Sequence, residues 1–121
     1  MKTLQELEAL SETDEGKQQI RVMVAGLFGW QMIKGERPSS LGHLIAQLDG
    51  KTGFVPFYHT SLDAIIPEVR KLDLSGQIKH CRHLSLIGSG KVNEYLVAEW
   101  MATSADAIHH CIALLLTLQR S

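Results

Sequence analysis

Cysteine is scarce in this sequence, and its scarcity argues against thiol catalysis and cysteine-based metal sites. Only Cys81 and Cys111 occur among 121 residues, and neither belongs to a C-x-x-C pair. Two cysteines without a spacing pattern are typical of a protein in a reducing cytoplasm. We therefore expect both thiols to be small core residues rather than nucleophiles or metal ligands.

The sequence also lacks an excess of charge of either sign. Its formal net charge is −1, so no global field attracts a nucleic-acid polymer or an anionic membrane. The longest apolar run, residues 111–116, is far too short to cross a bilayer. The first ten residues hold no apolar stretch typical of a signal peptide. These absences predict a cytoplasmic protein without a membrane or nucleic-acid polymer as partner.

No pattern of residues predicts catalysis. Residues 88–91 (GSGK) resemble part of a phosphate-binding loop, but that motif needs G-x-x-x-x-G-K-[ST] before a helix. Glu94 and Glu99 fall on opposite faces of a predicted strand, and capping explains Asp63 and Asp106. We predict that the protein is not an enzyme and has neither catalytic residues nor a cofactor.

Histidine is the metal-ligating residue type that the sequence does contain, as His43, His59, His80, His83, His109 and His110. On a strand His80 would point away from Cys81 and His83, and on a helix two adjacent histidines diverge by about 100°. A zinc site would need residues 80–83 to meet residues 109–111 across two elements. The prediction is that no metal is bound.

A six-residue phrase occurs twice. Residues 60–65 are TSLDAI and residues 103–108 are TSADAI, so five of the six positions are identical. A Thr or Ser oxygen accepts a free amide of a first helical turn, and an Asp three residues later lies near the positive end of the helix dipole. Both phrases therefore predict helix starts, and shared capping chemistry explains the repeat better than a duplication.

The spacing of apolar residues and turn-forming residues along the chain predicts an α+β fold. Helices are expected at 17–28 (with Asp14 as N-cap), 61–72 and 104–119, a short strand at 30–33, and a long loop at 35–53. Alternating residues predict a hairpin of two strands, 78–87 and 92–101. The expected architecture is one domain, 1–121, in which helices cover a small antiparallel sheet of three or four strands. The order is α-β-loop-α-β-β-α, with 1–16 as a weakly ordered segment.

The last predicted helix is apolar around most of its circumference. One sheet face cannot cover all of its large residues, which are Ile108, Cys111, Ile112, Leu114, Leu115, Leu116 and Leu118. Either the helix at 17–28 or a second subunit must cover the rest. We predict a homo-oligomer, most simply a two-fold dimer.

Aromatic and polar residues near the predicted strand ends suggest a binding surface. Aromatic rings together with Arg and Asn can hold the base and the phosphate of a small nucleotide. The alternative is structural: the rings would belong to the rim of the core, and Arg82 would pair with Glu94 or Glu99. The predicted ligand-binding residues are Tyr58, His59, Arg82, Asn93, Tyr95 and Trp100.

Two segments, VPFYHTSLDAIIPEV at 55–69 and ATSADAIHHCIALLLTL at 102–118, resemble small bacteriophage proteins of the phage ABA-sandwich family. The first contains the family's P-x-Y-x-x-S-x-D-A pattern, the second its final-helix phrase, and LFGW at 27–30 is similar to the end of its early helix. The resemblance spans residues 17–119, except that 35–53 lacks the expected loop rich in Trp and acids.

This resemblance implies a phage or prophage origin and the cytoplasm of a bacterial host, but no reaction. We therefore expect a non-enzymatic phage accessory protein that acts by binding and sequesters a small nucleotide-type signal of host defence. The alternative is a protein–protein interaction module that inhibits a host enzyme and has no ligand pocket.

Overall fold

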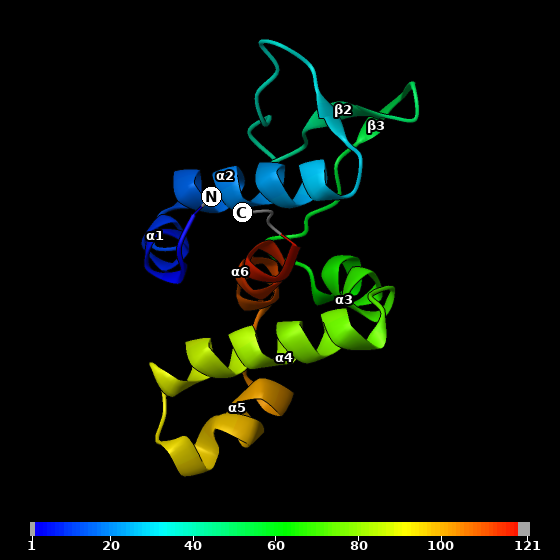
Figure 1. The fold of residues 1–121 in the computed structure, drawn as a ribbon. Helices are drawn as coiled ribbons and strands as arrows, with labels where there is room; N and C mark the ends of the chain where they lie inside the picture. The colour runs from blue at the N-terminus through cyan, green and yellow to red at the C-terminus, as the bar shows by residue number, and fades with distance from the viewer. Residues whose placement is uncertain (1, 119–121) are drawn as a thin grey trace.

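The computed structural model describes residues 2–118 and confirms an α+β fold (Figure 1). Its helices and strands, in chain order, are α1 (Leu4–Leu10), α2 (Asp14–Leu27), β1 (Gln31–Met32), β2 (Ile45–Leu48), β3 (Lys51–Phe54), α3 (Leu62–Arg70), α4 (Leu74–Ser89), the 3-10 turn η1 (Glu94–Leu96), α5 (Val97–Thr103) and α6 (Ala107–Leu118).

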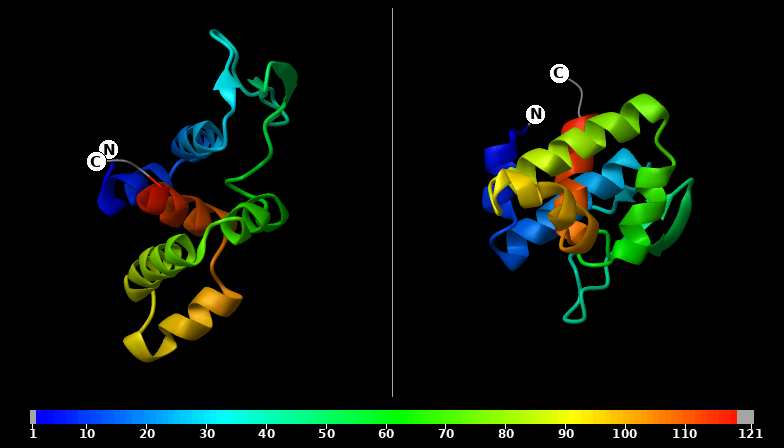
Figure 2. Two further views of the ribbon diagram at one scale, coloured as in Figure 1. Left: turned by 45° about the vertical axis from the view of Figure 1, so that its right-hand side comes forward. Right: turned by 90° about the horizontal axis from the view of Figure 1, so that it is seen from below.

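Helix α6 forms the centre of the molecule. It contacts α1, α2, α3 and α4, and Figures 1 and 2 show it between α2 on one side and α4 on the other. A helix that is apolar all round must be buried all round, and α6 buries Ala107, His110, Cys111, Ile112, Ala113, Leu114 and Leu115. The expected C-terminal helix is therefore confirmed within the described residues, although Gln119 lies outside them.

The four helices around α6 belong to the same chain. They cover Leu114 and Leu115, which are 0% and 2% exposed, so the apolar circumference of α6 no longer argues for a second subunit. The homo-oligomer stays a prediction, and light scattering of the purified protein tests it directly.

No single helix of residues 2–118 is long and apolar enough to cross a membrane. The segments Glu94–Thr103 and Ala107–Leu118 reach the required length and composition only as a pair, and this pair is bent by 107°.

The sheet has three antiparallel strands in the order β1-β2-β3. Ile45 pairs with Phe54 and Leu48 with Lys51, so Asp49 and Gly50 form a two-residue turn. Both turn residues have positive φ angles, 53° and 78°, as the tight hairpin turn that matches strand twist requires. The hairpin lies where a long loop, 35–53, was expected, and the sheet therefore comes from the first half of the chain.

The hairpin predicted at 78–87 and 92–101 is wrong, because these residues form α4, η1 and α5. The alternation of apolar residues from Ile78 to Leu86 fits a strand, but the buried residues of α4 have helical spacing: His80, Leu84, Ile87 and Gly88. Asp73 caps this helix by accepting a hydrogen bond from the Gly76 N–H at 2.7 Å. Helix α5 then packs on α4, with Trp100 against Gly88.

The N-terminal segment is not the weakly ordered stretch expected at 1–16. Thr3 and Glu6 form a reciprocal capping box at the start of α1, and Leu7 is completely buried in the core. Helix α2 follows at once, with Thr13 rather than Asp14 as its N-cap. This segment supplies one wall around α6.

The corner between α1 and α2 predicts a large effect of one glycine. A Cβ atom at Gly16 would lie 1.8 Å from the Leu10 carbonyl oxygen, whereas one at Gly26 of the same helix would meet nothing within 4 Å. Gly16→Ala should therefore destabilise the protein by about 1–3 kcal/mol. Gly26→Ala should leave it unchanged or slightly more stable. Thermal unfolding measures both, and equal melting temperatures for the two variants would contradict this packing.

Candidate functional site

The first repeated phrase starts helix α3 as expected. Ser61 is the N-cap, and its hydroxyl accepts a hydrogen bond from the Ala64 N–H at 3.3 Å. Asp63 lies in the first turn, near the positive end of the helix dipole. This part of the capping prediction is confirmed.

The second phrase precedes helix α6 but makes different hydrogen bonds from the first. The Thr103 hydroxyl donates to the Glu99 carbonyl at 2.7 Å, so Thr103 ends α5 instead of capping α6. Helix α6 begins at Ala107, and Asp106 precedes it. The Asp106 carbonyl accepts hydrogen bonds from the N–H groups of His109 and His110, while its own N–H donates to His109 Nδ1 at 2.9 Å. The helix start is confirmed, but the expected Thr–Ser cap is wrong.

Both phrases border one hollow of about 530 Å³, here named the cleft. Its walls come from residues 60–63 before and in α3, residues 106–108 at the start of α6, and Lys17 and His59. A second hollow of about 440 Å³, toward the loop at 38–42, shares Lys17, His59 and Thr60 with it. His59 therefore stands between two adjoining hollows.

Backbone amides of both helices lie free at the cleft. The N–H groups of Leu62 and Asp63 in α3, and of Ala107 and Ile108 in α6, have no hydrogen-bond partner within residues 2–118. Such amides are the first-turn donors that a helix cannot satisfy itself. They give the cleft two sets of donors at the positive ends of two helix dipoles.

Neighbouring side chains fix the tautomer of His59. Gln18 Oε1 accepts from Arg21 Nη1 at 3.2 Å, which leaves Gln18 Nε2 as a donor to His59 Nε2 at 3.4 Å. His59 Nε2 is then an acceptor, so Nδ1 carries the hydrogen of the neutral ring. The ring is 7% exposed, and its Nδ1 is buried without a partner in the described part of the chain.

The charges nearest His59 are positive. Burial first, and then the charges of Arg21 and Lys17, lower the pKa of His59 to about 4, so the ring is neutral at pH 7. Arg21 is completely buried. Its guanidinium donates to the carbonyls of Pro56 at 3.0 Å, Gly42 at 2.7 Å and Val55.

Arg21 also lies over the Phe57 ring, with its Cζ 4.6 Å from the centroid. It has no carboxylate partner, since the only ion pair among the described residues joins Lys71 to Glu68. Burial lowers the pKa of Arg21. Within residues 2–118, a buried cation without a counter-anion therefore lies next to the cleft's histidine.

The six predicted ligand-binding residues do not form one site. Tyr58 belongs to the core: its hydroxyl accepts from Trp30 Nε1 at 3.3 Å, and burial raises its pKa. Arg82 is exposed on α4 and pairs with neither Glu94 nor Glu99. Of the six, His59 alone lines the cleft.

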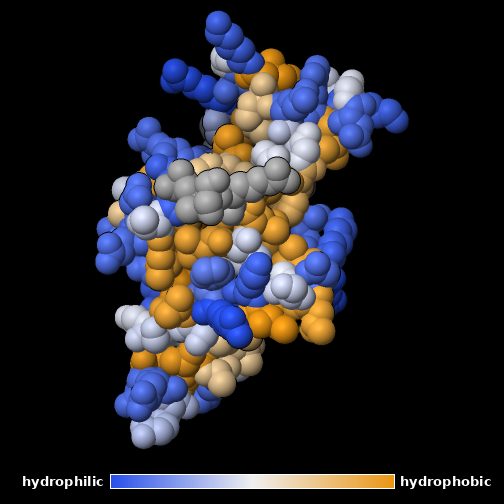
Figure 3. Space-filling view, viewed as in Figure 1, coloured by the Kyte–Doolittle hydropathy of each residue, from blue (hydrophilic) through white to orange (hydrophobic). Residues whose placement is uncertain are grey.

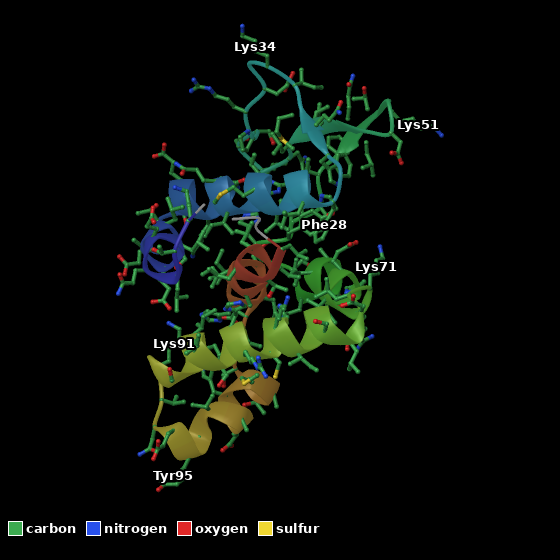
Figure 4. The ribbon with its side chains drawn as sticks, viewed as in Figure 1. Phe28, Lys34, Lys51, Lys71, Lys91 and Tyr95 are labelled. Carbon is green, nitrogen blue, oxygen red and sulfur yellow. The ribbon has the colours of Figure 1, made fainter. Side chains whose placement is uncertain are left out.

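The other three predicted residues lie around η1 and α5. Asn93 caps η1 by accepting from the Tyr95 N–H at 3.0 Å. Tyr95 is 86% exposed, and Figure 4 shows it at the opposite end of the molecule from Lys34 and Lys51, which mark the sheet end. Trp100 is buried against Gly88 and His109, with a centroid distance of 5.0 Å to the latter.

Sequence reasoning missed a buried pair of histidines between α4 and α6. His80 Nε2 and His110 Nδ1 are 3.1 Å apart, and the two rings stack with centroids 5.3 Å apart. Burial first, and then the charges of His110 and His83, lower the pKa of His80 to about 4. The helical spacing of His80, Leu84 and Ile87 is the sequence signal that could have placed His80 inside.

The cysteines have different environments. Cys111 is buried as expected; its Sγ donates to the Tyr58 carbonyl at 3.0 Å, and burial raises the pKa of the thiol. Cys81 is exposed on α4, so the expectation of a core position was wrong. Among residues 2–118 no group of three or more His, Cys, Asp or Glu side chains has the arrangement of a metal site.

A separate hollow, here named the α2 groove, runs between α2 and β1. It measures about 520 Å³. Its floor is apolar, and charged residues stand at its rim: the lining includes Val22, Met23, Met32, Ile33, Leu44 and Ile45, together with Glu15, Glu36 and Arg37. On the face in Figure 3, hydrophobic atoms also follow the seam between α2 and α4, whereas hydrophilic side chains crowd the sheet end.

The buried histidines predict that acid unfolds the protein. His59 and His80 titrate near pH 4 when folded and near their ordinary pKa of 6.5 when unfolded. The unfolded state therefore binds more protons below pH 6.5, and stability is lost as the pH falls from 6.5 toward 4. Each ring should cost about 2 kcal/mol at pH 4.5.

Melting temperatures between pH 7.5 and 4.5 measure this loss. The double variant His80→Leu/His110→Leu removes both partners of the buried pair and should flatten the pH dependence. The exposed His43→Gln should not change it. An unchanged slope in the double variant would contradict the assignment.

Comparison with known proteins leaves the family open: no family model, no curated protein and no solved structure matches this chain. The resemblance to phage ABA-sandwich proteins therefore stays a prediction.

Proposed function

We propose that the protein acts by binding a small molecule in the cleft between the two repeated phrases. The single observation that carries this proposal is the buried Nδ1–H of His59, which has no acceptor among the described residues. Leaving a buried donor unpaired costs about 1–3 kcal/mol. Such groups in native proteins are satisfied by water or a ligand, or mark a functional position.

The composition of the cleft supports binding rather than catalysis. Its lining contains no thiol. Its histidine, His59, is neutral at pH 7 and carries its hydrogen on Nδ1. The other ring nitrogen, Nε2, accepts from Gln18, so His59 is not poised to accept a proton from a nucleophile. The two carboxylates that line it, Asp63 and Asp106, stand at the starts of separate helices, where their charge offsets the helix dipoles.

Our proposal for the biological ligand is a small nucleotide-type signal of a bacterial host. The protein would then be a phage accessory protein that sequesters this signal. Free amides at helix N-termini are common binding sites for phosphate groups, and α3 and α6 both present them at the cleft. The residues that support this proposal are those of the cleft and not the dispersed set of six.

The α2 groove supports a second candidate, a protein–protein interaction module that inhibits a host enzyme. An apolar floor with a charged rim is the usual composition of a surface that receives an amphipathic segment. The two candidates differ in where substitutions act: at His59 for the small molecule, at Met23 and Ile33 for the protein partner.

Native mass spectrometry of untagged protein tests the main candidate. We expect a co-purified small molecule, in addition to the 13.4 kDa chain mass or its multiples. The ligand should be absent from His59→Gln and retained by the exposed control His43→Gln. A protein that carries no small molecule and is not stabilised by any member of a metabolite and nucleotide panel would contradict the proposal.

A further inference from the structure

We infer that the outer face of α4 is a docking surface for an acidic amphipathic helix of a partner protein. The apolar side of that helix packs on Leu74, Ile78 and Leu86, and one of its carboxylates pairs with Arg82. The surface is separate from the cleft and from the α2 groove, which residues 15–63 and 106–108 line. The inference therefore goes beyond the proposed function and does not depend on it.

Helix α4 packs on its neighbours with only part of its circumference. It contacts α6 and α5 (Figure 1), but its outward side carries large apolar residues: Leu74, Ile78 and Leu86 are 75%, 45% and 56% exposed. The other α-helices of residues 2–118 expose one such side chain, Leu62 in α3. One exposed apolar residue is ordinary, but several on one helix face mark a contact with another molecule.

The outward side of α4 has the shape that a second helix needs. Its side chains form a row of large residues and an adjoining row of small ones, each at intervals of four residues. The two rows are Leu74, Ile78, Arg82 and Leu86, and Cys81, Ser85 and Ser89. A shallow hollow of about 510 Å³ lies where the rows adjoin, between residues 81 and 86. A ridge of this spacing beside a groove is the surface into which the ridges of another helix fit.

The charge of this face selects an acidic partner. Residues 74–93 contain no Asp or Glu, but they include Lys79, Arg82 and Lys91. The only ion pair among the described residues joins Lys71 to Glu68, so these three cations have no carboxylate partner there. Arg82 is exposed within the row of large residues. An arginine inside a contact can bind a carboxylate through two parallel hydrogen bonds.

The same charges argue against two other occupants of this face. In a two-fold dimer through α4 the middle of the row would lie at the axis, so Lys79 and Arg82 of both copies would repel one another. A helix that lies on a membrane presents a continuous apolar face with its cations on the polar side. Here Arg82 interrupts the row between Ile78 and Leu86. A protein helix with a carboxylate at that point fits both the ridge and its charge.

Three designed peptides test this surface on the full chain. Each is an amphipathic helix of about 21 residues with the same leucine face, and the polar positions are Glu in one, Gln in the second and Lys in the third. We expect the Glu peptide to bind at least about tenfold more tightly than the other two. Amide NMR should place the shifts of its complex on residues 74–89.

Matched variants assign the contact. Arg82→Glu reverses the charge inside the row and should weaken the Glu peptide at least about tenfold while it strengthens the Lys peptide. Lys34→Glu changes the net charge equally at the sheet end (Figure 4) and should leave all three affinities unchanged. Ile78→Ser removes an exposed apolar side chain and should weaken the Glu and Gln peptides alike. The amide spectrum of each variant verifies that it is folded.

Several outcomes would overturn the inference. They are equal affinities for the three peptides, no binding of the Glu peptide at about 1 mM, and a loss in Lys34→Glu as large as in Arg82→Glu. Binding to phosphatidylserine vesicles that Arg82→Glu abolishes would assign the face to a lipid surface instead. A dimer in light scattering that Ile78→Glu dissociates would assign it to a second copy.

The same experiments keep this inference apart from the proposed function. Peptide shifts at Met23 and Ile33 would overturn docking on α4 and support the α2 groove as the protein-binding surface. Arg82→Glu should retain any small molecule that co-purifies in the cleft, because α4 does not line it. Failure of the peptides therefore leaves the cleft intact, and an empty cleft leaves the α4 surface intact.

Discussion

The burial of α6, seven of whose twelve residues are buried, is the constraint on which the rest of the structure depends. A helix that exposes no polar face needs walls on every side, and a chain of 121 residues supplies them from α1, α2, α3 and α4. The cleft lies where the start of α6 meets the start of α3, and it is therefore a consequence of how the core is closed.

Arg21 is the second organising contact, because it joins α2 to the segments on either side of the β-hairpin. Its guanidinium reaches carbonyls at Gly42, Val55 and Pro56, and thereby fastens the chain on either side of the β-hairpin to α2. Residues 57–61, which lead into α3, follow directly from this clamp. The position of His59 therefore depends on the hydrogen bonds of Arg21, which mainly stabilise the fold. The same guanidinium is one of the positive charges near His59.

Sequence reasoning succeeded where local chemistry decides the structure and failed where contacts between distant residues decide it. The start of α3 follows from Ser61, and the extent of α6 from its apolar residues. The alternation between Ile78 and Leu86 fits a strand as well as one face of a helix, and only the burial of His80, Leu84 and Ile87 against α6 distinguishes them. The candidate site failed for the same reason: four of its six residues were placed on an expected hairpin that does not form, namely Arg82, Asn93, Tyr95 and Trp100.

The repeated phrase illustrates how identical residues acquire different roles. Ser61 caps α3 with its hydroxyl, whereas Thr103 bonds back into α5 and leaves Asp106 to begin α6. In both copies the Asp lies at a helix start, where its charge offsets the dipole. The positive dipole ends of α3 and α6 are thus partly offset by a carboxylate of the phrase itself. Arg21 and Lys17, which lie outside both phrases, place positive charge next to His59. The repeated residues therefore set the starts of two helices, whereas the charge around His59 is set by α2.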